Sequence, residues 1–247
     1  GRIAGGDTAC GFANTAMVLA EKQYIPRVVA AVDRVVSIVR TLAAVNAGAV
    51  GPDKDCGYEG PFLKAIAGIP ISMEGKTAAC AHLSPVGNVS AACCDLWSNE
   101  SVANIKLLSD MAPVAYLEQL IYDTRLMNQA IARDSVLVLQ ELLVSSDIAY
   151  DPQAFILAPE NVIPIARAVA SARTPLEGAI DSAETALGLM RDAVSEGRLV
   201  LSDREKEWVP RMEDELGSIP RDESRFVEEM TEEIDAIGFG NLYHQTM

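Results

Sequence analysis

The chain has 247 residues, of which 49% are hydrophobic, 22% charged and 5% aromatic, and its formal net charge is −15. This composition is typical of a globular protein, and the length allows one large domain or two modest ones. The negative charge argues against nucleic acid or an anionic membrane as a partner, because both bind through basic patches. No apolar run reaches the roughly 20 residues of a membrane span, and no signal peptide is recognisable.

Five cysteines are present, at positions 10, 56, 80, 93 and 94. Their spacing does not suggest a secreted disulfide framework, so a reducing cytoplasm fits best. In that compartment thiols serve as core residues, metal ligands or nucleophiles. The chain opens with the letters GRIAGGD, without an initiator Met, as if within a strand. We therefore expect a fragment whose N-terminal portion is missing.

The first 48 residues alternate short strand-like runs with helical patterns. A brief strand at residues 2–4 precedes the loop that carries Cys10. Pro26 can begin a helix with Val28, Val32, Val35 and Val39 on one face, at spacings of three and four. The apolar run 42–45 is interpreted as a short buried strand.

The next segment repeats this order. The loop AGAVGPDKDCGYEG carries Cys56, a helix is expected around residues 62–66, and a strand at residues 69–73. A loop with Cys80 and His82 follows that strand. Strand, polar loop and helix in repetition indicate a parallel α/β architecture. In barrels of this kind the chemistry lies in loops that follow strands.

From about Asp110 onward the pattern is helical. Asp110 can cap one helix, and residues 174–177 form a capping box with proline at the first helical position. Residues 202–205 form a second capping box, and residues 222–235 predict a short acidic helix. The first capping box opens a helix that ends near Gly197. Its apolar positions are Leu176, Ile180, Ala183, Leu187, Met190 and Val194.

Cys10 and Cys56 are the strongest candidate ligands, because each follows a predicted strand within a polar, glycine-containing loop. Two thiolates with one carboxylate or imidazole, and a fourth position open, form the ligand set of a catalytic zinc. Ordinary loop thiols remain the alternative. Cys80 and His82 could be ligands or could orient them, although a core thiol and a hydrogen-bonded histidine are the commoner case. Cys93 and its neighbour at position 94 fit a helical core.

Charged residues in the same loops could bind substrate or tune a metal. They are Asp7, Asp53, Asp55, Glu74 and Lys76. Solvated charges are the commoner case, and no spacing distinguishes one of the five. His244 is expected to be exposed. The sequence shows no phosphate-binding loop, dinucleotide fingerprint or nucleophile elbow.

Three stretches of unusual composition, residues 6–17, 48–59 and 73–82, resemble the zinc-dependent methanol:corrinoid methyltransferases, also called methanol-cobalamin methyltransferases. Residues 94–102 and 151–155 strengthen the resemblance, which runs in order along nearly the whole chain. It implies the C-terminal half of a TIM-type (β/α)8 barrel, followed by an all-helical segment. Residues 1–109 would be the barrel units and residues 110–247 the helical region packed on them.

The resemblance also implies a function and a site. Zinc would be held by Cys10, Cys56 and a glutamate that precedes this chain, and would act as a Lewis acid on the methanol oxygen. The methyl group would pass to the Co(I) corrinoid of a partner corrinoid protein, with the methyltransferase as a homodimer within a hetero-oligomer. Acid–base candidates are Asp7, Asp55 and His82, and substrate-binding candidates are Glu74 and Lys76.

Two alternatives stay open. A related zinc methyltransferase could use another methyl donor, such as a methoxylated aromatic or a methylamine. A catalytically incomplete fragment could instead serve as a module for dimerisation or for docking of the corrinoid protein.

Overall fold

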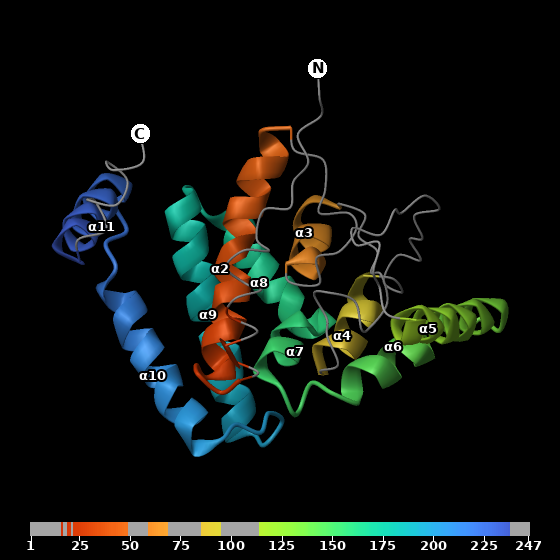
Figure 1. Cartoon of the computed structure of the whole chain (residues 1–247). Coiled ribbons are helices and arrows are strands. Elements are labelled where there is room, and N and C mark those ends of the chain that lie inside the picture. Colours follow the sequence, from red (N-terminus) through yellow and green to blue (C-terminus); the bar gives the residue numbers. More distant parts are fainter. Residues whose placement is uncertain are drawn as a thin grey trace.

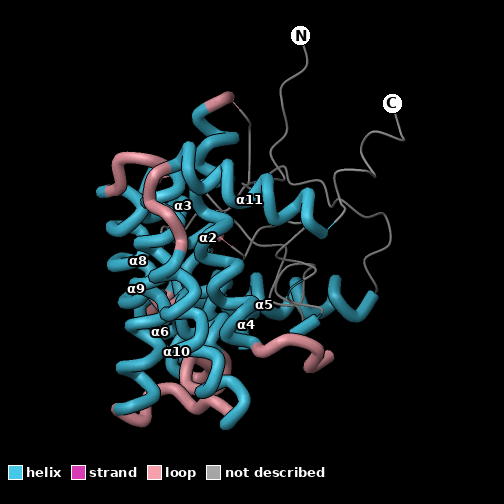
Figure 2. Tube along the Cα trace, turned by 90° about the vertical axis from the view of Figure 1, so that its left-hand side faces the viewer, coloured by secondary structure: helices cyan, strands magenta, loops and turns pink. Residues whose placement is uncertain are grey.

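The computed structural model of the protein describes residues 16, 19–20, 22–48, 59–68, 85–94 and 114–237. Every regular element within these ranges is an α-helix, and Figure 2 shows helices joined by loops throughout the described part. The helices labelled in Figure 1 are α2 (Arg27–Asn46), α3 (Gly60–Ala67), α4 (Pro85–Cys94), α5 (Val114–Ala132), α6 (Val136–Ser145), α7 (Pro152–Leu157), α8 (Pro159–Ser171), α9 (Pro175–Ser195), α10 (Asp203–Ser218) and α11 (Glu223–Ile237).

Helix α2 begins directly after Pro26, as the sequence predicts. Val28 and Val35 of the predicted valine face are fully buried, and Val32 and Val39 pack against the core with part of their surface exposed. The spacing of three and four residues therefore identified the buried side of the helix correctly.

The strand predicted at residues 42–45 is wrong, because these residues form the last turns of α2. Ala43 and Ala44 are strong helix formers, and no glycine or proline interrupts the chain before Gly48. Gly48 has φ +91°, a conformation that glycine adopts without strain, and there the chain leaves the helix. A short apolar run does not by itself separate a strand from a helix end.

Helix α3 confirms the helix expected around residues 62–66. Pro61 lies in its first turn, and Gly68 ends it with φ 65°. Phe62 and Leu63 are fully buried. This short helix therefore contributes two large apolar side chains to the core although it has only 8 residues.

Helix α9 begins at Pro175, where the Thr174 hydroxyl accepts the backbone N–H of Glu177. The Glu177 carboxylate accepts the backbone N–H of Arg173 at 2.8 Å instead of that of Thr174, so only one half of the predicted capping box forms. Gly197 follows the C-cap residue with φ +74°. Ile180, Ala183, Leu187 and Met190 of the predicted stripe are buried, while Leu176 and Val194 are partly exposed.

The second capping box, at the start of α10, is complete. Ser202 accepts the backbone N–H of Glu205, and the Glu205 carboxylate accepts the backbone N–H of Ser202. The acidic helix α11 also forms, with Asp222 accepting the backbone N–H of Arg225 at 2.9 Å. Arg221, just before α11, binds Asp181 and Glu184 of α9. These contacts fix the turn between α10 and α11 to α9.

The core lies where α9 packs against α2 and α8, with α3, α4 and α7 completing it. Figure 1 shows α10 and α11 on one side of this centre and the α5–α6 pair on the other. The largest fully buried apolar side chains are Phe62, Phe155, Ile38, Leu63, Ile156, Leu157, Ile165, Leu187 and Met190. They come from both halves of the sequence, so residues before 95 and after 113 share one core.

Several predictions fall outside the described residues. They include the strands at residues 2–4 and 69–73, the cap at Asp110 and the division between residues 109 and 110. The half-barrel therefore stays a prediction from the sequence.

Candidate functional site

The predicted site residues lie outside the part of the chain that the structure describes. They are Cys10 and Cys56 as metal ligands, Asp7, Asp55 and His82 as acid–base groups, Glu74 and Lys76 as substrate contacts, and Cys80 and Asp53 as further candidates. The structure consequently neither brings them together nor separates them. It does describe the helices that flank the two cysteine loops, α2 between them and α3 directly after the second.

A buried hydrogen bond joins these two helices next to the second cysteine loop. The Thr41 hydroxyl of α2 donates to Glu59 Oε1 at 2.8 Å. Both residues are buried, with exposed fractions of 1% for Thr41 and 0% for Glu59. Glu59 precedes α3 and lies three residues after Cys56. The end of the cysteine loop is thus bound directly to α2.

Thr41 belongs to a row of polar residues on α2 spaced seven apart, Arg27, Arg34 and Thr41. Positions seven apart lie on the same side of an α-helix, since two turns span 7.2 residues. Arg34 has an exposed fraction of 0%, and its Nη2 donates to Gln153 Oε1 of α7 at 3.0 Å. We call these three residues the polar row of α2. Each of them binds a different partner far away in the sequence.

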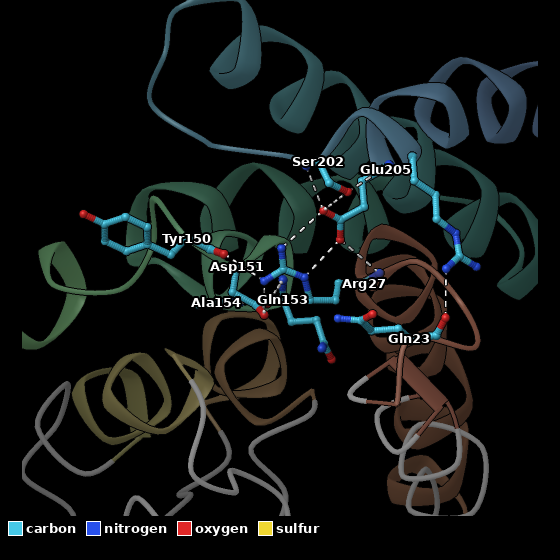
Figure 3. A network of polar contacts seen from close by, with 9 residues as sticks. Gln23, Arg27, Tyr150, Asp151, Gln153, Ala154, Ser202 and Glu205 are labelled. Carbon is cyan, nitrogen blue, oxygen red and sulfur yellow. Dashed lines mark hydrogen bonds and ion pairs between the residues drawn. The ribbon is translucent and has the colours of Figure 1, made fainter.

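Arg27 makes the most extensive of these contacts (Figure 3). Its Nε donates to Glu205 Oε1 at 3.0 Å, and its Nη1 donates to Asp151 Oδ2 at 3.2 Å and to the Tyr150 carbonyl at 2.9 Å. Asp151 also caps α7 by accepting the backbone N–H of Gln153 at 2.7 Å. One guanidinium therefore connects the starts of three helices, α2, α7 and α10.

Burial acts differently on the two carboxylates that bind Arg27. Burial raises the pKa of the Asp151 carboxyl, and this outweighs the opposite pull of Arg27 and of the backbone N–H groups at the start of α7. Burial also opposes ionisation of Glu205, but hydrogen bonds from Arg27 and Ser202 prevail and lower the pKa of Glu205. The folded state therefore favours the charged form of Glu205 more than the unfolded chain does, and that of Asp151 less.

A surface hollow of about 400 Å³ lies beside this junction. Its lining comes from the segment before α2, with Gln23, Ile25 and Pro26, and from the start of α10, with Ser202 and Arg204. The Arg204 guanidinium donates to the carbonyls of Gln23 at 2.8 Å and of Tyr24, while Arg27 is engaged by its own carboxylates. The cationic groups at this hollow are therefore already bound, which makes it a structural junction.

Cys93 of α4 is excluded as a thiolate ligand. It is fully buried and its Sγ donates to the Leu157 carbonyl at 2.9 Å. Burial raises the pKa of the Cys93 thiol, so the thiol stays protonated. The prediction that Cys93 belongs to the core is confirmed; the side chain at position 94 is outside the described set.

Within the described ranges, no group of three or more His, Cys, Asp and Glu side chains could hold a metal ion. In the same ranges, no helix has the length and apolar character that crossing a membrane requires. Two thiols are suitable donors for zinc, which prefers sulfur and nitrogen ligands.

Sequence reasoning missed the polar row of α2 and its partner Glu59. The signal was nevertheless present, because Arg27, Arg34 and Thr41 recur every seven residues on the side of the helix that also carries the buried Val28, Val35 and Ile38. A polar residue in register with a buried face indicates a partner elsewhere, since an unbonded buried polar group is costly. The sequence alone did not show that the partners are Gln153 and Glu59.

Three comparisons with known proteins agree with one another. The family model described as methanol-cobalamin methyltransferase B subunit matches residues 1–239. A methanol–corrinoid protein co-methyltransferase of Methanosarcina barkeri (strain Fusaro / DSM 804) is 36% identical over 232 residues, which are 93% of this chain and 50% of the relative.

A solved structure gives the same result. The crystal structure of the methanol:cobalamin methyltransferase complex MtaBC from Methanosarcina barkeri superimposes with a TM-score of 0.79 and 35% identity. The match covers 94% of this chain and 51% of the solved chain. The present chain thus spans about half the length of the relatives that it matches. The resemblance noted in the sequence is confirmed, and the chain belongs to the methanol-cobalamin methyltransferase B subunit family.

Proposed function

We propose that this chain takes part in methyl transfer from methanol to the corrinoid of a partner corrinoid protein. The observation that carries the proposal is the family match over residues 1–239, together with a relative named methanol–corrinoid protein co-methyltransferase. The described part is compatible with it, because the helices around the cysteine loops form one packed core.

Cys10 and Cys56 are the proposed zinc ligands. Zinc commonly binds thiolates, whereas calcium and magnesium prefer oxygen ligands. When bound, zinc would supply Lewis-acid polarisation of the methanol oxygen. Cys10 follows the strand predicted at residues 2–4, and in a TIM-type barrel the loops that follow strands carry the site. Residues 42–45, predicted as the strand before Cys56, form the end of helix α2, so this rule supports Cys10 alone. The buried Cys93 thiol is not a candidate ligand, because its S–H donates to the Leu157 carbonyl.

The other loop residues have proposed roles around the thiolates. Hydroxide is a poor leaving group, so an acid near the methanol oxygen would assist its departure, and Asp7, Asp55 and His82 are the candidates. Glu74 and Lys76 would contact the substrate. The corrinoid protein would cover the site and exclude water during transfer. Pairing of two such methyltransferase chains in the assembly is part of the same proposal.

A second function, docking of the corrinoid protein without catalysis, is favoured by one observation. Large apolar side chains are exposed on α5 and α6, namely Ile121, Tyr122, Leu126, Ile131, Leu137, Val138 and Leu142. Exposed large apolar side chains that gather on two neighbouring helices can mark a protein interface. The chain length, about half that of its relatives, is consistent with either function.

One assay separates these functions. The purified protein is mixed with a corrinoid protein reduced to Co(I) and with methanol, a methylamine or a methoxylated aromatic, and methyl-Co(III) is followed by its absorption spectrum. Methylation with methanol and with neither other donor supports the proposal. Methylation with another donor alone would show that this donor, and not methanol, is the substrate. Binding of the corrinoid protein without methylation from any donor would contradict methyl transfer and support docking.

A further inference from the structure

Helix α11 carries apolar side chains that the other described helices leave uncovered. Phe226, Val227, Met230 and Ile234 are related by spacings of three, four, seven and eight residues, which place them on one side of an α-helix. Val227 and Ile234 have exposed fractions of 60% and 51%, and the other two are partly exposed. Figure 1 shows α11 beyond the end of α10, and no described helix packs against it as closely as the core helices pack on one another. We call these four residues the apolar stripe of α11.

The rest of the α11 surface is strongly acidic. The helix has six acidic residues and one basic residue, Arg225, which binds Glu229 within the helix, so its net charge is −5. At about 100° per residue, five of the acidic residues fall outside the arc of the apolar stripe. They are Glu228, Glu229, Glu232, Glu233 and Asp235. An apolar stripe with a charged remainder is typical of a helix that packs one side against another surface.

The charge of α11 distinguishes between the surfaces that could cover the stripe. A second copy of α11 would bring together two helices of net charge −5, in chains whose own net charge is −15, and like charges at close range repel. A membrane is disfavoured because amphipathic helices that bind membranes carry Lys and Arg on their polar side. An apolar surface bordered by Lys and Arg on another protein complements both sides of the helix.

The start of α11 is fixed to the body of the protein. Arg221 binds Asp181 at 2.5 Å and Glu184 at 3.0 Å, both on α9. Asp222 accepts the backbone N–H of Arg225 at 2.9 Å. These contacts hold the first turn of the helix and leave the apolar stripe exposed. A helix that is already formed and held loses less conformational entropy on binding than a disordered segment does.

We propose that α11 is a docking helix for a partner protein that presents an apolar surface bordered by Lys and Arg. Val227, Met230 and Ile234 are its apolar anchors, at the i, i+3 and i+7 spacing by which helices dock into grooves. The acidic side pairs with the basic border of the partner and fixes the orientation of the helix. The inference goes beyond the proposed function, since neither the metal nor the methyl donor enters it.

The test uses two fluorescent peptides of identical Leu and Lys composition as probes. In the first peptide the leucines follow the spacing of one helix face, and in the second their order is scrambled. Binding to the purified protein is measured by fluorescence anisotropy at about 0.15 M salt, where long-range attraction between exposed charges is largely screened. The scrambled peptide therefore reports attraction by charge alone.

The variant Val227→Gln/Ile234→Gln removes two anchors without changing the charge. Glutamine has at least the helix propensity of valine and isoleucine, so α11 should stay helical, which circular dichroism verifies. Val200→Gln is the matched control, because Val200 precedes α10 and has an exposed fraction of 61%.

We expect the wild type and Val200→Gln to bind the patterned peptide at least about tenfold more tightly than the scrambled one, and the double variant to lose this preference. Equal binding of the two peptides by the wild type would overturn the proposal. An undiminished preference in the double variant would also overturn it, by placing the binding on another surface.

Three further measurements on the same proteins test the other occupants. Sedimentation, the urea midpoint and binding to phosphatidylcholine vesicles should not differ between the wild type and the double variant. Loss of a dimer in the double variant would assign the stripe to a second copy, and loss of vesicle binding would assign it to a membrane. A urea midpoint below that of Val200→Gln would show that the stripe packs within its own chain. Each of these three results would overturn the proposal.

Discussion

Helices α2 and α9 have nearly the same length, 20 and 21 residues, and pack against each other, but they are held in different ways. The large buried side chains of α9 are apolar, with Ile180, Leu187 and Met190 at its centre. Helix α2 also buries apolar side chains, but its polar row adds hydrogen bonds and ion pairs to α3, α7 and α10. The contact between the two helices is close, because a Cβ at Gly178 of α9 would lie 3.2 Å from Val39 Cγ1.

The two kinds of contact contribute differently, since one stabilises the fold and the other fixes the position of neighbouring segments. Apolar burial stabilises roughly in proportion to area and has little direction. A buried hydrogen bond contributes less net free energy but fixes one geometry and is costly when one partner is removed. Helix α9 therefore supplies core stability, whereas α2, which lies between the two predicted ligand loops, supplies position as well.

The largest effect that sharpens this comparison is expected from Leu187→Ala. Leu187 is fully buried, and removal of its side chain should lower the free energy of unfolding by about 2–5 kcal/mol through lost transfer free energy and the cavity left behind. Urea denaturation followed by circular dichroism measures the change. Below the unfolding transition, zinc affinity should remain that of the wild type. Weakened zinc binding in folded Leu187→Ala would break the proposed distinction between the helices.

A smaller effect with a pH signature is expected from Glu205→Gln. The Arg27–Glu205 pair is part of the polar junction, and its loss should cost about 1–2 kcal/mol at neutral pH. Because the pKa of Glu205 in the folded protein is lowered from its ordinary value of 4.5, the ionised group stabilises the fold above that pH. The contribution is lost as pH falls through the folded-state pKa. Asp151, whose pKa is raised, changes the pH dependence of stability in the opposite direction. Because Asp151 is present in both the wild type and Glu205→Gln, the comparison of the two proteins isolates Glu205.

Urea denaturation of both proteins across the acid range measures this difference. The stability gap should be widest above pH 4.5 and should close as the pH falls further. Glu215→Gln on the same helix is the control, because Glu215 pairs with Arg211 at the surface and should change stability by less than about 0.5–1 kcal/mol. A gap that does not depend on pH, or an equal loss in the control, would contradict the role assigned to the Arg27 junction.

Local rules predicted the helical part of this molecule well. The start of α2 at Pro26, the complete capping box at Ser202 and the turn at Gly197 follow from residues adjacent in sequence. Apolar spacing also identified the buried faces of α2 and α9. The error at residues 42–45 arose because four apolar residues satisfy both a strand and a helix end.

The polar contacts could not be predicted in the same way. Glu59 and Thr41 are 18 residues apart and Arg27 and Glu205 are 178 apart, so no local pattern pairs them. For the candidate site, the sequence predicted the metal-donor residues Cys10 and Cys56. Their loops lie outside the described ranges. The family resemblance was the one long-range signal in the sequence, and the comparisons confirm it.

Zinc content after serine substitution tests the central proposal, that the thiols at positions 10 and 56 together hold a catalytic metal. Cys10→Ser, Cys56→Ser and the wild type are purified with zinc and dialysed, and the metal is quantified by mass spectrometry. Cys93→Ser serves as the control, since a serine hydroxyl can replace the hydrogen bond to Leu157. Stoichiometric zinc in the wild type and control, with loss from both other variants, is the predicted result. Full zinc content in Cys10→Ser or Cys56→Ser would contradict it.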